Sequence, residues 1–329
     1  MPPSTSADVA ARPSARGQAA PTTGGEAVGL DGDSTDVPLP RRQAGTSPQH
    51  LLVTLLGDYW NGRREHLPSA ALVALVEEFD VGEVSARAAL RRLARRGVLE
   101  SSKVGRNTYY GLSASATRTI VQSSSRIVQL GTGERSWDGV WTLATFSLPE
   151  EQRDLRHLLR SRLRWLGFAP LFDGVWVSPR ASTDEVREFL DELEITTAAV
   201  LRAEEAVGTP LISAWDLEEI RRAYDAFLAD TSPLRARLDG GDVGSAEALI
   251  ARTRLMDVWR TFPALDPDLP EEVLPADWPR RRARAVFGEL YDALGPLAEA
   301  RVRQVLARFD AALAPLVAHH TTSDLSAAR

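Results

Sequence analysis

The amino-acid sequence predicts an α+β protein with an N-terminal winged helix-turn-helix, a central ferredoxin-like β-α-β-β-α-β domain and a helical C-terminal domain. Three observations predict this class. Near the N-terminus, three segments with helical spacing of apolar residues precede two short β-prone runs around a polar, glycine-containing turn. In the middle of the chain, strand and helix patterns alternate in the order β-α-β-β-α-β. Beyond about residue 211 the apolar spacing is helical.

The division into parts follows from length and composition. With 329 residues the chain is long enough for two or three compact units. Residues 1–46 are rich in Pro, Ala, Gly, Ser and Thr and have few large apolar side chains, so they cannot offset the entropy of ordering. In chain order we expect a disordered tail (1–46), a winged-helix domain (47–117), a connector (118–135), a ferredoxin-like domain (136–208), a helical domain (209–318) and a tail (319–329).

The predicted winged-helix domain begins with a helix at Ser47-Pro48. A second helix starts near Pro68, whose fixed φ suits a first helical turn, and ends near Asp80. A third helix spans Glu83 to Arg96, where Gly97 supplies a C-terminal stop. The positions expected to face inward are Leu51, Leu52, Leu55, Leu56, Tyr59, Leu72, Leu75, Val76, Phe79, Ala86, Ala89, Leu90 and Leu93.

The remaining elements are predicted from short apolar runs. The runs Val98–Glu100 and Thr108–Tyr110 enclose a polar turn and indicate a hairpin. The central domain is expected to contain strand Trp141–Phe146, helix Glu151–Leu166, a hairpin-like pair Phe168–Ser178 bent at Asp173-Gly174, helix Asp184–Leu193 and strand Ala199–Arg202. The C-terminal domain is expected to contain helices Trp215–Asp230, Ser245–Arg260 and Pro279–Leu294, a proline-punctuated crossing at Pro263–Pro279, and a last helical segment to about Val317.

Composition excludes several classes of protein. The sequence has no cysteine, which removes disulfides, thiolate metal sites and cysteine nucleophiles and fits a reducing compartment such as the cytoplasm. No histidine has a recognised metal-ligand spacing, and we expect no metal and no cofactor. Neither a membrane-spanning apolar run nor a secretory signal is found, so we expect a cytoplasmic protein without membrane contact.

A local excess of positive charge indicates where nucleic acid would bind. The net charge is −6, yet seven basic residues and one acid, Glu100, lie between Val84 and Arg106. We expect Arg87 or Arg91, on one face of the third helix, to contact bases in the major groove of duplex DNA. Phosphate contacts are expected from Arg92, Arg95 and Arg96 of the helix and from Lys103 and Arg106 at the hairpin tip. The alternative interpretation is an ordinary solvated arginine surface.

The sequence also resembles a known family. The matching motifs are Gly57–Tyr59, Arg87–Leu93, Gly97–Leu99, Gly105-Arg106, Tyr109-Tyr110, Trp137–Trp141, Leu163–Phe168, Gly174–Pro179, Trp215–Leu217, Asp266–Pro270 and Leu274–Pro279. In this order they resemble the PaaX family of bacterial phenylacetate-degradation repressors, from about residue 47 to residue 300. Two positions depart from the family pattern. Gly82 precedes the third helix instead of a Ser-type cap, and Asp257-Val258 stands where a His-Glu-like pair is expected, which puts the effector in doubt.

The resemblance implies a function. It implies a homodimeric, DNA-binding transcriptional repressor that is not an enzyme, that controls an aromatic-acid, phenylacetate-type catabolic operon, and that an acyl-CoA or aromatic metabolite releases from its operator. A dimer also fits recognition, because one helix-turn-helix contacts too few base pairs for strong specificity. Arg222, Tyr224, Trp259 and Arg260 could supply cations and apolar surface for such an effector, although each could equally be a core or surface residue.

Two other functions stay open at this point. The central domain resembles the fold of the CRISPR-associated spacer-acquisition nuclease, whose first strand ends in a metal-binding Asp. The corresponding run here, Trp141–Ser147, has no carboxylate, which argues against a metal-dependent nuclease. The second alternative is a DNA-binding architectural protein without an effector. We expect Trp165, Trp176 and Phe168 to be packing residues or dimer contacts rather than ligand contacts.

Overall fold

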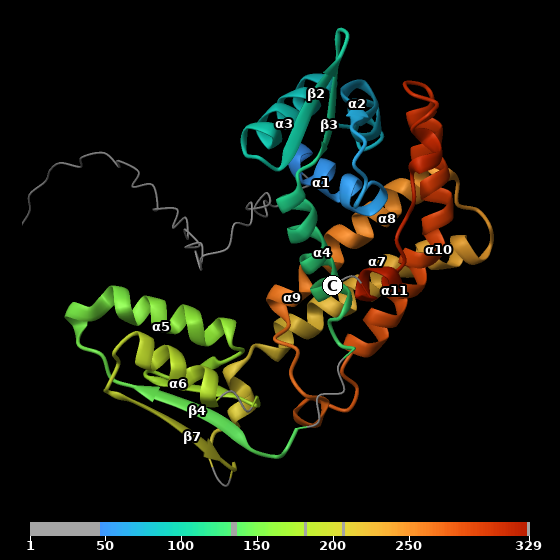
Figure 1. The fold of residues 1–329 in the computed structure, drawn as a ribbon. Coiled ribbons are helices and arrows are strands. Elements are labelled where there is room, and N and C mark those ends of the chain that lie inside the picture. The colour runs from blue at the N-terminus through green and yellow to red at the C-terminus, as the bar shows by residue number, and fades with distance from the viewer. Residues whose placement is uncertain (1–46, 133–136, 181–182, 206–207, 328–329) are drawn as a thin grey trace, which may run out of the picture. The chain divides into compact units, whose positions relative to one another are not determined.

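The structure, a computed structural model, describes residues 47–132, 137–180, 183–205 and 208–327, and by their contacts these fall into one compact unit. The predicted disordered tail, residues 1–46, lies outside the described residues. Figure 1 shows mixed helix and sheet at the N-terminus and in the centre, and helices at the C-terminal end of the chain.

The N-terminal part packs three helices against a small antiparallel sheet. Ser47 caps the first helix by accepting a hydrogen bond from His50 N at 3.3 Å, and Gly97, with φ +72°, follows the third. The sheet order is β1-β3-β2, and the hairpin of β2 and β3 projects beyond the helices (Figure 1). The elements are α1 (Pro48–Tyr59), β1 (Leu67–Pro68), α2 (Ser69–Glu77), α3 (Glu83–Arg95), β2 (Leu99–Val104) and β3 (Asn107–Leu112). The positions predicted to face inward are buried, except for the half-buried Phe79.

Two features of this region differ from the sequence prediction. Leu67–Pro68 pairs with β3 as the short strand β1, and two residues are too few for an alternating pattern to be recognised. The connector expected at 118–135 is largely helical, because α4 (Ala114–Val128) begins almost directly after β3. The Ser113 side chain caps this helix by accepting a hydrogen bond from Ala116 N at 3.2 Å. The hairpin of β2 and β3 and the central part of the chain are thus joined by a helix.

The central part has the predicted β-α-β-β-α-β order. Its elements are β4 (Trp141–Phe146), α5 (Arg153–Trp165), β5 (Ala169–Phe172), β6 (Val175–Ser178), α6 (Thr183–Glu192) and β7 (Ala198–Ala203). The strand order is β5-β6-β4-β7, and all three pairings are antiparallel. Helices α5 and α6 lie on the same side of the sheet in Figure 1, and Leu163, Phe189 and Trp176 meet there in one buried cluster. The ferredoxin-like prediction for this part is confirmed.

The C-terminal part is helical, with longer helices than predicted. It contains α7 (Leu217–Asp239), α8 (Ser245–Trp259), the short α9 (Phe262–Leu265) and α10 (Arg280–Ala307). The sequence predicts breaks at Asp230 and Leu294, but α7 continues through Pro233 and α10 through Pro296. A proline removes one backbone hydrogen bond from a helix. In α10 the buried residues on both sides of Pro296, from Leu290 to Val302, hold the helix in one piece.

The C-terminal end is held against the helical part instead of forming the expected free tail at 319–329. Arg252 Nη2 donates to His320 O at 2.6 Å, and Thr322 Oγ1 donates to Asp292 Oδ2 at 2.8 Å. The segment then forms α11 (Thr322–Ala327) with Leu325 buried. These contacts lie far apart in sequence, so local composition gave no signal for them. In the part of the chain that the structure describes, no helix is both long and apolar enough to cross a membrane.

Candidate nucleic-acid interface

Helix α3 has one buried face and one basic face. Ala86, Ala89, Leu90 and Leu93 are buried in the core of the N-terminal part. At 100° per residue, Val84, Arg91 and Arg95 lie at the centre of the opposite face, with Arg87 and Arg92 on its two flanks. All five are exposed, and Val84 is 81% exposed. The sequence thus folds one side of α3 into the core and leaves a solvent-facing row of guanidinium groups.

Among the described residues, the four arginines Arg87, Arg91, Arg92 and Arg95 make no strong ion pair. Arg87 Nε lies 2.7 Å from Glu83 Oε1, but both side chains are exposed, and such a pair contributes only about 0–1 kcal/mol. Arg91, Arg92 and Arg95 surround a shallow hollow of about 460 Å³ that Tyr110 of β3 also lines. A phosphate or a base edge could therefore replace water at this surface without breaking the fold.

Two further predicted residues, Lys103 and Arg106, lie at the hairpin tip. They flank Gly105, whose φ of +62° is the left-handed conformation that glycine adopts without strain. Both basic side chains are exposed. The structure therefore places the seven predicted residues in two groups, one on α3 and one at the tip. Sequence reasoning missed His66, which faces β3 where Gly111 leaves room for its ring, and whose Nδ1 lies 2.8 Å from Ser102 Oγ of β2.

A buried polar network links α1 to the C-terminal helices. The Arg252 side chain of α8 is fully buried, and its Nη1 lies 3.5 Å from Asp58 Oδ2 of α1. Tyr291 of α10 donates its hydroxyl to Asp58 Oδ1 at 3.0 Å, and its ring lies 3.7 Å from the Arg252 guanidinium carbon. Burial raises the pKa of Asp58, although the Arg252 charge opposes this. Asp58, the central residue of the Gly57–Tyr59 motif, therefore has a structural role: it connects α1 to α8 and α10.

The four predicted effector residues do not form one binding site. Tyr224 and Trp259 have 0% exposure and lie in an aromatic core, where Tyr224 stacks on Phe262 with ring centroids 4.3 Å apart. Burial raises the pKa of the Tyr224 hydroxyl, which donates to Asp266 at 2.7 Å. Arg260 donates to Thr54 Oγ1 at 3.1 Å, and Arg222 is exposed on α7. Tyr224 and Trp259 are therefore core residues, as the alternative interpretation had it.

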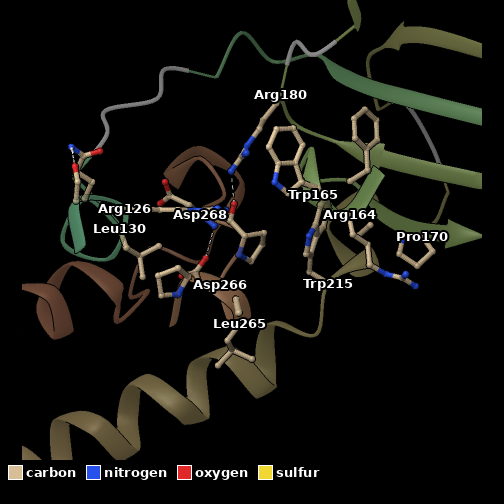
Figure 2. Close-up of a pocket in the computed structure, with 18 of the residues that line it drawn as sticks. Arg126, Leu130, Arg164, Trp165, Pro170, Arg180, Trp215, Leu265, Asp266 and Asp268 are labelled. Carbon is tan, nitrogen blue, oxygen red and sulfur yellow. Dashed lines mark hydrogen bonds between the residues drawn. The ribbon is translucent and has the colours of Figure 1, made fainter. Parts of the chain in front are cut away.

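A cavity of about 550 Å³ lies elsewhere, and none of those four residues lines it. Its walls come from α4, from the end of α5 and the start of β5, from Trp215, and from α9 with the loop that follows it, residues Pro263–Asp268. Figure 2 shows Arg126, Arg164 and Arg180 around this space, together with the indole of Trp165. Arg180 Nη2 donates to Pro267 O at 2.6 Å across the cavity. Of the three residues predicted as packing residues or dimer contacts, Trp165 is 56% exposed, whereas Trp176 and Phe168 are buried.

Among residues 47–132, 137–180, 183–205 and 208–327, no three or more His, Asp or Glu side chains come together in an arrangement that could hold a metal ion. Strand β4, the first strand of the central sheet, carries no carboxylate.

Comparison with known proteins places the chain in a family. Residues 47–116 match the family described as PaaX-like protein, residues 134–211 the PaaX protein central Cas2-like domain, and residues 215–304 the PaaX-like protein C-terminal domain. The transcriptional repressor PaaX of Escherichia coli is 30% identical over 275 residues, which cover 79% of this chain and 84% of that protein. An uncharacterized protein from Mycobacterium tuberculosis shares the fold, with a TM-score of 0.52, 22% identity, and coverage of 79% of this chain and 98% of that chain. The chain therefore belongs to the PaaX family.

Proposed function

We propose that the chain is a DNA-binding transcriptional repressor, in which residues 47–117 act as a winged helix-turn-helix and α3 is the recognition helix. The exposed arginine face of α3, opposite a fully buried apolar face, is the observation that carries this proposal. A helix with this division can enter a major groove while its core side stays packed. The basic hairpin tip and the relation to a transcriptional repressor of Escherichia coli support the same function.

The arrangement suggests separate tasks for the basic residues. Arg91, at the centre of the exposed face of α3, is suited to the acceptor edge of guanine, with Arg87 next to it. Arg92, Arg95 and Arg96 are suited to phosphates on either side of the groove. Lys103 and Arg106 would extend the contact to the flanking backbone or minor groove, which increases affinity without reading sequence.

We further propose that a small effector controls this repressor. By the family resemblance, the protein is a homodimer that binds two half-sites about 34–36 Å apart, or a multiple of that, and represses an aromatic-acid operon of phenylacetate type. An acyl-CoA or aromatic metabolite then lowers its operator affinity. Such an effector must bind better to the conformation that does not bind the operator, because a ligand without this difference in affinity shifts no equilibrium.

The test measures binding of the full chain to the DNA upstream of its own gene at two salt concentrations. The variant Arg87→Ala plus Arg91→Ala is compared with Arg254→Ala plus Arg282→Ala, which removes two exposed positive charges elsewhere. We expect specific, sub-micromolar binding by the intact chain and the control, and loss of specificity in the first variant. Weak, salt-sensitive binding that the first variant leaves unchanged would contradict the assignment of α3.

A further inference from the structure

We propose that a row of basic side chains on α5 binds the phosphate backbone of the DNA beside the base pairs that α3 reads. This inference rests on the proposed function, because it adds a second contact to the same DNA. The row belongs to the central part of the chain, outside the winged-helix residues 47–117, and consists of Arg153, His157, Arg160 and Arg164.

The four side chains of the row project from one flank of α5. At about 100° per residue they fall within about 60° of one another around the helix, beside the buried stripe of Leu159 and Leu163. All of them are exposed except Arg160, which is half-buried. At about 1.5 Å per residue the row is roughly 16 Å long, and over that length duplex DNA presents about five phosphates on each strand. The row therefore matches a short stretch of DNA backbone in length.

The stability of α5 does not explain this row. Arg153 is in the first turn, where a positive charge opposes the helix dipole. Arg160 and Arg164 are four residues apart, and like charges at this spacing destabilise an isolated helix by about 0.2–0.5 kcal/mol. Asp154, the single acid of α5, forms no ion pair with the row in the described residues. A bound polyanion would replace this repulsion with attraction.

The row has few competing partners inside the protein. Within the described ranges, Arg153 and His157 have no hydrogen-bond or ion-pair partner. Arg160 Nη2 lies 2.9 Å from Asp173 Oδ1, but the Asp173 side chain is 95% exposed, and such a pair contributes only about 0–1 kcal/mol. Arg160 Nε is buried and has no hydrogen-bond partner among these residues. A phosphate oxygen could therefore bind at Arg160 without breaking a strong internal contact.

A hollow beside the row can receive a phosphate group. Its volume is about 230 Å³, and it lies between Arg160 and Arg164 of α5 and the turn that joins β5 to β6. The Arg164 guanidinium lies 5.2 Å from the ring of the buried Trp176, a cation–π contact that orients it. Guanidinium groups match phosphate oxygens with two parallel hydrogen bonds. Two arginines at one hollow therefore suit a phosphate of the DNA backbone.

The helix next in sequence order on this side of the sheet has the opposite charge. Helix α6, which lies on the same side as α5 in Figure 1, contains five acids and one arginine. In the described residues, no arginine of α5 forms an ion pair with an acid of α6. The positive charge of α5 thus does not serve to hold these two helices together. DNA would be attracted at α5 and repelled at α6, which favours one direction of approach.

The test measures binding of three forms of the full chain to the DNA upstream of its own gene. Arg153→Gln plus Arg160→Gln removes two charges of the row. The control, Arg162→Gln plus Arg187→Gln, removes one charge from the other flank of α5 and one from α6. Arg164 is kept, because it also lines the cavity of about 550 Å³. We expect the first variant to reduce the slope of log affinity against log salt by about 2, and the control to leave it unchanged.

Hydroxyl-radical footprinting of the same complexes locates the contact. We expect the intact chain and the control to protect a stretch of about five base pairs that the first variant leaves open. Protection that depends on Arg87 and Arg91 should remain in all three forms.

Three results would overturn the proposal while the repressor function stands. In the first, the row variant keeps the slope and footprint of the intact chain. In the second, the control changes both by the same amount. In the third, the row variant alters only sedimentation, which would show that the row binds a second copy of the chain. If the intact chain does not bind the upstream DNA specifically, the proposed function and this inference both fail.

Discussion

At the scale of single residues, replacing two glycines of α10 by alanine is expected to change the free energy of unfolding in opposite directions. A Cβ at Gly295 would lie 2.3 Å from Cδ2 of His319, so alanine there must displace the His319 ring. A Cβ at Gly288 would meet only Thr322 Oγ1, at 3.9 Å. We expect Gly295→Ala to lower the free energy of unfolding by about 1–3 kcal/mol through overpacking. Gly288→Ala should raise it by up to about 1 kcal/mol, because alanine has the higher helix propensity.

Urea denaturation of the two variants and the intact chain measures this difference. Both substitutions lie in one helix and add the same methyl group, so Gly288→Ala is a matched control for helix propensity. Equal stabilisation by both alanines would mean that the contact of His319 with α10 is absent in solution.

Several residues show where sequence reasoning reaches its limit. Tyr224, Trp259 and Trp165 are aromatic residues that each lie within two residues of an arginine in the sequence, and nothing local distinguishes them. In the structure the first two are fully buried and Trp165 is 56% exposed. The difference comes from which helix face meets the core, and for the C-terminal helices that depends on neighbours far away in sequence. The basic face of α3 was predictable, because its buried stripe is local and regular.

At the scale of elements, α3 and the hairpin are expected to contribute differently to DNA binding. Side chains of α3 should determine sequence specificity, and those of the hairpin tip should add affinity. Val84 is in the first turn of α3, is 81% exposed, and shares its face with Arg91. The N-terminal residues of a recognition helix contact base edges, and an apolar side chain there can pack on the methyl group of thymine. We therefore expect Val84→Ala, which removes two methyl groups at roughly 0.8 kcal/mol each, to weaken binding to the operator about tenfold without changing the salt dependence.

Lys103→Ala is the matched substitution in the hairpin. Because Lys103 is expected to contact phosphate, its loss should weaken operator and unrelated DNA alike and reduce the slope of log affinity against log salt by about 1. Fluorescence anisotropy with operator, single-base variants and unrelated DNA at three salt concentrations separates these effects. A uniform loss for Val84→Ala on every DNA would show that this side chain does not read bases.

Element boundaries were predictable where a local signal fixed them. Ser47 and Gly97 are such signals, and α1 and α3 begin and end next to them. Pro233 and Pro296 also predict helix ends, but α7 and α10 continue through them. The stabilisation from tertiary packing along these helices exceeds the cost of one missing backbone hydrogen bond. Strand β1 had no signal, since it consists of two residues that pair only because β3 is beside them.

At the scale of the whole molecule, attachment of the C-terminal segment should depend on pH. Glu299 Oε2 of α10 accepts from His319 N at 2.9 Å and lies 2.6 Å from His319 Nδ1. Desolvation raises the pKa of Glu299, but the hydrogen bonds from His319 and the Arg303 charge outweigh it, so the pKa lies below its ordinary value of 4.5. The stabilisation is therefore present above about pH 4.5 and is lost as the pH falls through the lowered pKa.

Glu299→Gln tests this dependence. At pH 7 we expect it to lower the free energy of unfolding by about 1.5–3 kcal/mol, the usual value for a hydrogen bond to a charged group. Towards pH 3 the difference between variant and intact chain should shrink, because the carboxyl group is then increasingly protonated. A difference that stays constant from pH 7 to pH 3, measured by urea denaturation, would show that the ionised carboxylate contributes nothing.

The order of strands in the central sheet was predictable, whereas the cavity was not. Four strands and two helices in the order β-α-β-β-α-β have few arrangements with short connections, so β5-β6-β4-β7 follows from the pattern. The cavity needs Arg126, Arg180 and Asp268 to meet, and these residues belong to three parts of the chain. The spacing of apolar residues in one of these parts gives no information about which residues of the other parts will lie beside it.

The buried network of Asp58, Arg252 and Tyr291 joins α1 to the helices at the other end of the chain, so substitutions in it should lower the stability of the whole molecule. Arg252→Met leaves the buried Asp58 without its cation and should lower the free energy of unfolding by about 3–5 kcal/mol. Asp58→Asn should cost less, since burial already raises the pKa of this carboxyl group and disfavours its charge. In the Asp58→Asn background, Arg252→Met should therefore cost at least about 1 kcal/mol less than alone. Additive losses in this double-mutant cycle would show that α1 and α8 are held together by apolar packing, and that the ion pair does not couple the N-terminal part to the C-terminal helices.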